Sequence, residues 1–213
     1  MAEPSLRFMR IGLTGGSGSG KSLVASILLE NGVPSLDTDA VVHSLYEGGE
    51  YPQTLASLFG DTILTPTGAV DRMALAAIVF ADREKLALLN KTVHGAVREI
   101  CLRFLREQEA AGFRAAVIDA PQLFEAGMEG DFDRIIAVYA PKKDRVKRIM
   151  ERDGITRAAA ERRLASQKPA SFFKAHCDLL IKNPVGSDRS SLTAQLLPLL
   201  RQIKPTTTKE NRT

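Results

Sequence analysis

The residues best suited to chemistry are the glycines, the lysine and the last serine of GLTGGSGSGKS, residues 12–22. Residues 15–22 match G-x-x-x-x-G-K-[ST] at every defined position, with an apolar segment before the match and a helical pattern after it. Glycines let successive backbone N–H groups turn inward around an anion, and the N-terminus of the following helix adds positive partial charge. The motif therefore predicts a nucleoside triphosphate site.

Each position of this phosphate loop has an expected task. Lys21 can reach the β- and γ-phosphates, and the Ser22 hydroxyl can ligate Mg²⁺. The expected ATP-binding residues of the loop and the first helical turn are Gly16, Ser17, Gly18, Ser19, Gly20, Lys21, Ser22 and Leu23. A switch GTPase is disfavoured, because no Asp is followed three residues later by Gly, and the NKTV of residues 90–93 lacks the aspartate of NKxD.

Carboxylates follow two of the expected strands. LDTDAVVH places Asp37 and Asp39 two apart in an extended segment, so both could point into the same cleft at the carboxyl edge of the sheet. One of them could orient and deprotonate a hydroxyl, and one could instead cap the next helix. Asp119 ends another strand, where P-loop proteins often keep a carboxylate that organises Mg²⁺, and Glu125 follows in the same loop.

Residues 141–168 form the most basic part of the chain, with a net charge of +6 against +4 for the whole protein. Arg148 and Arg152 lie four residues apart and so share a helix face, from which an arginine could stabilise a transferred phosphoryl group. The same charge would suit a nucleic-acid surface or an ordinary solvated face. Charge by itself leaves these three interpretations open.

Strands and helices alternate along the chain, which is typical of a parallel α/β sheet covered on both faces. The apolar runs predict strands at residues 8–14, 33–37, 115–119, 134–140 and 177–181. They predict helices at residues 21–31, stopped by Gly32, and at 190–203.

Two segments interrupt this alternation. About 75 residues between the second and third strands indicate a helical insertion, in which Asp71 caps residues 72–80 and Asp82 caps a long helix towards Gln108. The basic segment indicates two helices broken near residues 153–154, with Thr156 as the second cap.

Composition excludes several other classes of protein. Hydrophobic residues make up 44% and charged residues 25%, as in ordinary globular proteins. No apolar run reaches the roughly 18 residues of a membrane span, and the N-terminus lacks a signal-peptide pattern. Cys101 and Cys177 are far apart and indicate neither a disulfide framework nor a zinc site. We expect a cytoplasmic protein.

Seven blocks of sequence, in order, resemble the dephospho-CoA kinase family. They are GLTGGSGSGKS, GVPSLDTDAVVH, FGDTIL with GAVDRMAL, VHGAVR, VIDAPQLFE, RIMERDGIT and CDLLIKN, which together cover roughly residues 9–200. That family transfers the γ-phosphate of ATP to the 3′-hydroxyl of dephospho-CoA, the last step of coenzyme A synthesis. The resemblance implies a P-loop NTPase fold with a five-stranded parallel sheet in the order 2-3-1-4-5.

The resemblance also implies roles for individual residues. Asp39 would be the base, with Lys21 and Arg148 as the other catalytic residues, and Ser22 and Asp119 would hold Mg²⁺. The residues expected on the acceptor side are Thr14, Asp39, His94, Arg98, Leu123, Phe124 and Glu125. Those expected at ATP, besides the loop, are Arg148 and Arg152 in the lid, with Gln167 closing it, and Asn183 near the adenine.

The family pattern further divides the chain into parts. Residues 7–44, 112–140 and 176–203 would form the nucleotide-binding core, 45–111 the helical acceptor domain, 141–175 the lid, and 204–213 a disordered tail. ATP and Mg²⁺ are the expected co-substrate and cofactor, and dephospho-CoA is the expected partner. We expect a monomer with no nucleic-acid or membrane partner. The alternatives are another P-loop kinase of small metabolites, such as a nucleoside or sugar kinase, and an ATP-regulated nucleic-acid-binding protein.

The chain departs from the usual family pattern at four positions. Gly95 stands where proline usually follows the histidine, and Gln122 replaces a leucine of Pro-Leu-Leu. Arg145 stands where a glutamine is common, and Cys177 where alanine usually precedes Asp178. None of these changes alters the phosphate loop or Asp39.

Overall fold

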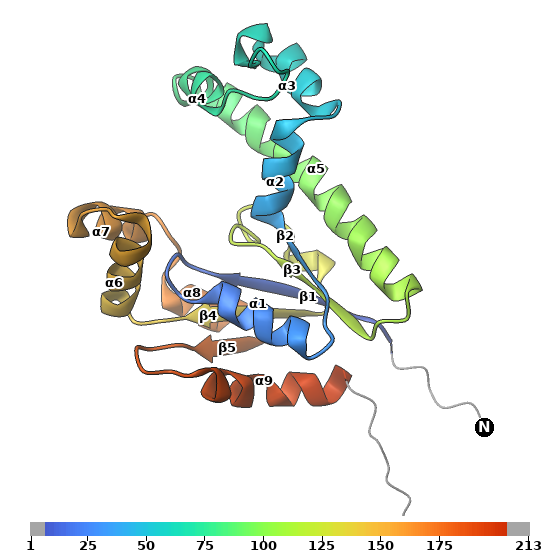
Figure 1. The fold of residues 1–213 in the computed structure, drawn as a ribbon, viewed down its shortest axis with the longest axis vertical. Coiled ribbons are helices and arrows are strands. Elements are labelled where there is room, and N and C mark those ends of the chain that lie inside the picture. The colour runs from blue at the N-terminus through green and yellow to red at the C-terminus, as the bar shows by residue number, and fades with distance from the viewer. Residues whose placement is uncertain (1–6, 204–213) are drawn as a thin grey trace, which may run out of the picture. The chain divides into compact units, whose positions relative to one another are not determined.

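A computed structural model describes residues 7–203, so the predicted tail at 204–213 lies outside the described residues. The strands are β1 (Met9–Gly15), β2 (Ser35–Asp37), β3 (Ala115–Asp119), β4 (Arg134–Tyr139) and β5 (Leu179–Lys182). The helices are α1 (Lys21–Glu30), α2 (Thr38–Glu47), α3 (Tyr51–Phe59), α4 (Arg72–Phe80), α5 (Arg83–Ala110), α6 (Lys142–Asp153), α7 (Arg157–Ala165), α8 (Ala170–His176) and α9 (Arg189–Ile203). The chain divides into two compact units, residues 36–104 and the described residues on either side of them (Figure 1).

The sheet has the order β2-β3-β1-β4-β5, as predicted. Strand β1 pairs in parallel with β3 on one side and β4 on the other, and β4 pairs in parallel with β5. The register places Leu13 opposite Asp119 and Gly15 opposite Val138. The carboxyl ends of the three central strands therefore meet where the phosphate loop leaves β1.

Helices α1 and α9 pack together against the sheet (Figure 1). In α1 the buried residues Val24, Ile27 and Leu28 recur at helical spacing, and they contact a core that includes Ile11 and Ile136. This apolar face fixes the direction of α1, and with it the direction in which the N-terminus of α1 points. Burial of the helix thus positions the loop that precedes it.

The predicted strand at residues 177–181 begins later, because the chain there first completes a helix that was not predicted separately. The Cys177 N–H donates to the Phe173 carbonyl at 3.0 Å and so closes α8. Strand β5 starts only at Leu179, after the Asp178 N–H has bonded to the Ile135 carbonyl. Similarly, β2 begins at Ser35 rather than at residue 33.

The basic segment forms the two predicted helices. Helix α6 ends at Gly154, and the Thr156 hydroxyl accepts the Ala159 N–H at 3.3 Å at the start of α7. The pair has its own apolar contacts, made by Val146, Ile149, Ala160 and Leu164. These contacts pack α6 against α7 and so fix the helix surfaces from which the basic side chains project.

Within residues 36–104, the two predicted caps are also confirmed. The Asp71 carboxylate accepts the N–H groups of Met73 and Ala74 at 2.9 and 3.1 Å, and Asp82 accepts that of Glu84 at 2.9 Å. Helix α5 continues through Gly95, where an added Cβ would meet no atom within 4 Å. Packing therefore does not require glycine at that position.

Replacing Asp71 with alanine should destabilise the helical unit by about 1 kcal/mol, since two N–H groups of α4 would lose their acceptor. Urea unfolding followed by circular dichroism would measure the change. Asp61→Ala, which removes an exposed carboxylate from the same unit, serves as the control and should change stability by less than about 0.5 kcal/mol. Equal losses in the two variants would show that charge, and not capping, matters at Asp71.

Candidate functional site

The phosphate loop between β1 and α1 is shaped by backbone conformations that favour glycine. Gly18 and Gly20 have φ angles of 73° and 91°, in the left-handed region. A Cβ on Gly18 would lie 2.8 Å from the Arg145 carbonyl oxygen, and one on Gly20 would overlap the Asn183 side chain. Helix α1 begins at Lys21 with no side-chain cap and no acidic residue in its first turn. Its first amides can therefore bind an anion.

Lys21 and Asp119 form an ion pair under this loop. Their side chains are only 14% and 7% exposed, respectively. The strand register explains this pairing. Asp119 ends β3 opposite Leu13 of β1, and Lys21 begins α1 after the loop that follows β1. A buried lysine and carboxylate depend on each other for compensation of charge.

Ser19 and Ser22 contribute hydroxyl groups with different surroundings. The Ser19 Oγ is buried and has no hydrogen-bond partner among the described residues. Ser22, in the first turn of α1, is exposed. A buried hydroxyl without a partner is unusual, and in a glycine-rich loop it indicates that an incoming ligand completes its bonding.

Two predicted residues from distant segments bond to the carbonyls of the loop. Arg148 of α6 donates to Gly18 O at 3.2 Å and to Ser19 O at 3.4 Å. The Asn183 side chain, 4% exposed, donates to Ser19 O at 2.8 Å. The structure thus brings Arg148 and Asn183 to the loop.

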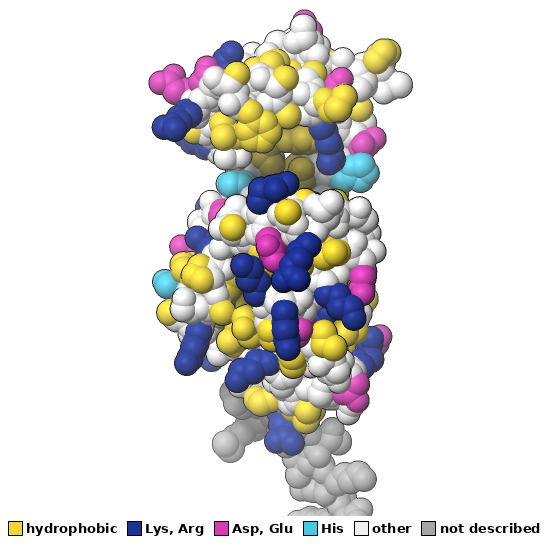
Figure 2. All heavy atoms as spheres, turned by 90° about the vertical axis from the view of Figure 1, so that its left-hand side faces the viewer, with side chains coloured by type: hydrophobic (Ala, Val, Ile, Leu, Met, Phe, Trp, Pro, Cys, Tyr) yellow, Lys and Arg dark blue, Asp and Glu magenta, His cyan; other side chains and the backbone are white. Residues whose placement is uncertain are grey.

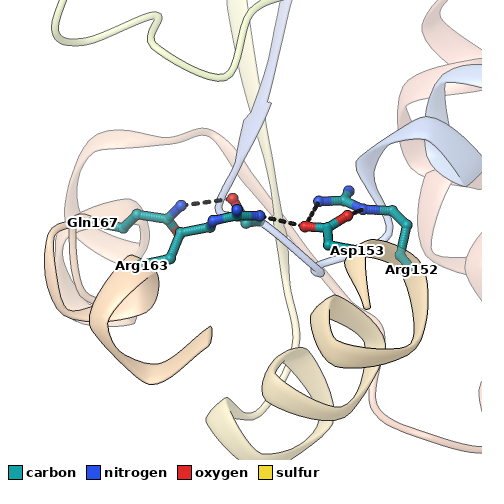
Figure 3. A network of polar contacts seen from close by, with 5 residues as sticks. Arg152, Asp153, Arg163 and Gln167 are labelled. Carbon is teal, nitrogen blue, oxygen red and sulfur yellow. Dashed lines mark hydrogen bonds and ion pairs between the residues drawn. The ribbon is translucent and has the colours of Figure 1, made fainter. Parts of the chain in front are cut away.

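Arg152, the second predicted lid arginine, bonds to a neighbouring carboxylate instead (Figure 3). Its Nε lies 2.7 Å from Asp153 Oδ1, and Arg163 of α7 binds the other oxygen of Asp153. Hydrogen bonds from Arg152, and then from Arg163, lower the pKa of Asp153 to about 2. In this structure Arg152 therefore makes no contact with the phosphate loop.

Sequence reasoning missed a second arginine at the loop, Arg145. The Arg145 Nε donates to Ser17 O at 2.9 Å, and its guanidinium also bonds to Gln167 Oε1. Gln167 itself contacts Ser17 twice, accepting from its N–H at 3.1 Å and donating to its hydroxyl at 2.7 Å. The available signal was spacing, since Arg145 precedes Arg148 by three residues and so shares its helix face.

Lys and Arg side chains are prominent on the face of the molecule that carries α6 and α7 (Figure 2). Of the ten cations of residues 141–168, two contact the phosphate loop directly, Arg145 and Arg148, within the described residues. Several others form ion pairs with acidic neighbours of the same segment, as Lys147 does with Glu151 at 3.8 Å. The segment is thus partly a loop-binding surface and partly a solvated one.

The loop after β3 contains three of the residues predicted on the acceptor side, and a fourth, Thr14 of β1, bonds to it. The Thr14 hydroxyl donates to the Pro121 carbonyl at 3.3 Å and ties this loop to β1. Leu123 is fully buried. Phe124 packs edge-on against Phe172 of α8, with ring centroids 5.0 Å apart, and Glu125 lies 3.5 Å from Lys168. Among the predicted residues of this loop, Phe124 is half-buried and Glu125 is exposed.

Asp37 and Asp39 do not lie together in an extended segment, and that prediction was wrong. Asp37 is the last extended residue and caps α2, because its Oδ1 accepts the Asp39 N–H at 2.9 Å. Asp39 lies in the first helical turn, exposed, and its carboxylate has no hydrogen-bond partner among residues 7–203. A helix starts here because Asp37 supplies the cap that its first amides need.

His94 and Arg98 lie one turn apart on α5, within residues 36–104. The flanking Val93 and Val97 are buried, whereas His94 is half-buried and Arg98 exposed. The buried valines therefore fix the face of α5 from which the two polar side chains project. None of the helices that the structure describes has the length and apolar character needed to cross a membrane.

Comparison with known proteins identifies the family. The family model described as dephospho-CoA kinase matches residues 9–189. The dephospho-CoA kinase of Moorella thermoacetica is 46% identical over 189 residues, covering 87% of this chain and 88% of the relative. A crystal structure of TT1252 from Thermus thermophilus has a TM-score of 0.79 at 32% identity, covering 93% of this chain and all of the other. Dephospho-CoA kinase from Campylobacter jejuni has a TM-score of 0.68 at 25% identity and covers 91% of this chain.

These matches extend over most of the chain and include the phosphate loop, the loop after β3 and the two basic helices. The chain belongs to the dephospho-CoA kinase family.

Proposed function

We propose that this protein transfers the γ-phosphate of ATP to the 3′-hydroxyl of dephospho-CoA, giving ADP and coenzyme A. Membership of a kinase family supports the reaction, and the observation that carries the proposal is the phosphate loop with Lys21 beneath it and Arg148 above it. A loop of this kind binds the phosphates of a nucleotide. ATP is accordingly the phosphoryl donor that a kinase of this family uses.

The chain's own groups fit a triphosphate. The amides at the start of α1 are open, the Ser19 hydroxyl lacks a partner among the described residues, and the glycines let the loop adopt left-handed φ angles. Lys21 would exchange the Asp119 carboxylate for phosphate oxygens, and Arg148 would turn from the loop carbonyls to the phosphoryl group. In each case a partner within the protein, the Asp119 carboxylate or a loop carbonyl, is replaced by a charged oxygen of the substrate phosphates.

Mg²⁺ would be held by the Ser22 hydroxyl and the Asp119 carboxylate. Both are oxygen donors, which is the chemistry that Mg²⁺ prefers, together with water and substrate phosphates. Mg²⁺ supplies neutralisation of the charge on the β- and γ-phosphate oxygens. The ion pair with Lys21 holds the Asp119 carboxylate close to the loop.

Asp39 would receive the proton of the attacking hydroxyl. Its carboxylate is exposed and unengaged among the described residues, whereas that of Asp37 is committed to capping α2. Since phosphoryl transfer passes through a largely dissociative transition state, orientation of the hydroxyl matters at least as much as basicity. The division of labour between the two acids therefore favours Asp39 as the base.

The remaining expected residues would bind the acceptor and close the site. Residues 45–111 would form the acceptor domain with His94 and Arg98, joined by Thr14 and the loop at residues 123–125. Residues 141–175 would form the lid, and Asn183 would lie near the adenine. Contacts of the basic segment with the phosphate loop support a lid rather than a nucleic-acid surface. That the protein acts as a monomer in the cytoplasm stays a prediction of the sequence.

Changing Asp39 to asparagine should lower the rate of coenzyme A formation at least about a hundredfold, because the base is lost while the side chain keeps its size. The measurement follows ADP and coenzyme A together in purified protein supplied with ATP and dephospho-CoA.

The matched control is Asp37→Ser, which keeps an oxygen able to accept the Asp39 N–H. Its rate should stay within about threefold of the unchanged enzyme, since serine and aspartate cap helices about equally well. A collapse of the rate in Asp37→Ser, with Asp39→Asn active, would reverse the assignment. ADP without coenzyme A in the unchanged enzyme would refute the proposed reaction.

Changing Arg148 to glutamine should lower kcat by about a thousandfold or more, as expected when an arginine that stabilises the phosphoryl group is removed. Lys147→Gln removes a neighbouring cation of α6 that is exposed and pairs with Glu151, and it should leave kcat within about threefold. Initial rates at saturating ATP and dephospho-CoA give both values. Similar losses in the two variants would mean that the net charge of α6, and not the place of Arg148, is important.

A further inference from the structure

Arg145 is a cation whose partners in the structure are all neutral. Its guanidinium is half-buried and bonds to a backbone carbonyl and a side-chain amide, and no carboxylate of the described residues lies within ion-pair distance. Burial lowers the pKa of this guanidinium. A partly desolvated cation without an anion is a costly arrangement that an anionic ligand would relieve.

The Gln167 Oε1 atom shows where that ligand could bind. It accepts a hydrogen bond from the Ser17 N–H at 3.1 Å and a second from Arg145. A Cβ on Gly16 would lie 2.6 Å from this oxygen and closer still to the guanidinium, so both groups lie directly on the backbone of the loop. One oxygen atom is thus held by a loop amide and a cation together.

This pair of donors suits a phosphate oxygen better than an amide oxygen. Hydrogen bonds in which the donor or the acceptor is ionised are about twice as strong as those between neutral groups. A guanidinium group also matches the geometry of phosphate and carboxylate oxygens. The neutral Gln167 amide stands in for such an anionic oxygen. When the ligand binds, Gln167 would lose the hydrogen bonds that its Oε1 accepts from Ser17 and Arg145. Its Nε2 contact with Ser17 Oγ, at 2.7 Å, would either remain or break with them.

We propose that the Ser17 N–H and the Arg145 guanidinium form a site for an oxygen of the terminal phosphate of ATP, and that Gln167 Oε1 occupies this site until the nucleotide binds. The inference rests on the proposed function and adds a binding residue to it. The free amides at the N-terminus of α1, near residues 20–22, would hold the other phosphates. Ser17 lies at the other end of the loop, which leaves its site to the last phosphate.

Arg145 would therefore distinguish ATP from ADP. Arg148, three residues further along the same face of α6, contacts the adjacent carbonyls of Gly18 and Ser19. The two arginines would close over the terminal phosphate together.

The test is to measure the binding of a non-hydrolysable ATP analogue and of ADP, each with Mg²⁺, to Arg145→Gln by titration calorimetry. We expect the Kd of the analogue to rise roughly ten- to a hundredfold, as for loss of a charged hydrogen bond, while that of ADP changes less than about threefold. Preserved ADP binding also shows that the variant is folded. Lys147→Gln, the matched loss of charge on α6, should leave both Kd values within about threefold.

Two results would overturn the proposal. Equal weakening of ADP and the analogue would mean that Arg145 only supports the loop, and unchanged binding of both would mean that it contacts no phosphate. Gln167→Ala should strengthen binding of the analogue a few-fold, since the internal occupant is gone, and weaker binding would refute the displacement. These titrations need no acceptor, so failure of the unchanged protein to form coenzyme A would refute the proposed reaction while leaving this inference standing.

Discussion

The outward-facing carbonyls of the phosphate loop are the constraint on which the rest of the nucleotide-binding unit depends. For the N–H groups of a loop to turn inward around an anion, its carbonyls must turn outward, and each then needs a donor. Ser17 O is bound by Arg145, Gly18 O by Arg148, and Ser19 O by Arg148 and Asn183. Segments more than 120 residues away in the sequence therefore hold the loop in shape.

This arrangement gives the same side chains two uses. Without nucleotide, the cations of α6 satisfy carbonyls, and Lys21 and Asp119 neutralise each other in a nearly buried pair. A triphosphate offers stronger partners to all of these cations at once, so binding exchanges internal bonds for bonds to the substrate. The charge of Lys21 is compensated in both states, which avoids the large penalty of an isolated buried ion.

The helical unit of residues 36–104 is stabilised by a different kind of interaction. Helices α2, α4 and α5 start at aspartates that accept the first free N–H groups, namely Asp37, Asp71 and Asp82. Its core, which includes Leu55, Phe59 and Ile63, lies among short helices that are close in sequence. Capping at Asp37 has a consequence for chemistry, because it occupies one acid of the DTD sequence and leaves the other exposed.

Local interactions explain what the sequence by itself determined. The caps at Asp71, Asp82 and Thr156 involve bonds between residues a few positions apart, so their residue types reveal them directly. The phosphate loop and the strands are recognisable from motif spacing and apolar runs within single segments. The order of the strands also followed, through the resemblance of seven sequence blocks to a known family. The outcome at Asp37 and Asp39 was also local: the extended spacing was wrong because α2 starts at Thr38, and the alternative that one acid caps this helix is confirmed for Asp37.

Only the tertiary structure decided which cations reach the loop. Ten Lys and Arg residues lie in residues 141–168, and although spacing places Arg145, Arg148 and Arg152 near one helix face, it does not show that the first two contact the loop while Arg152 bonds to Asp153. That choice depends on where the sheet, the loop and the apolar contacts of α6 with α7 place one helix face. Long flexible side chains bond to the partners that lie within their reach. The distances between segments far apart in sequence are fixed only when the chain folds.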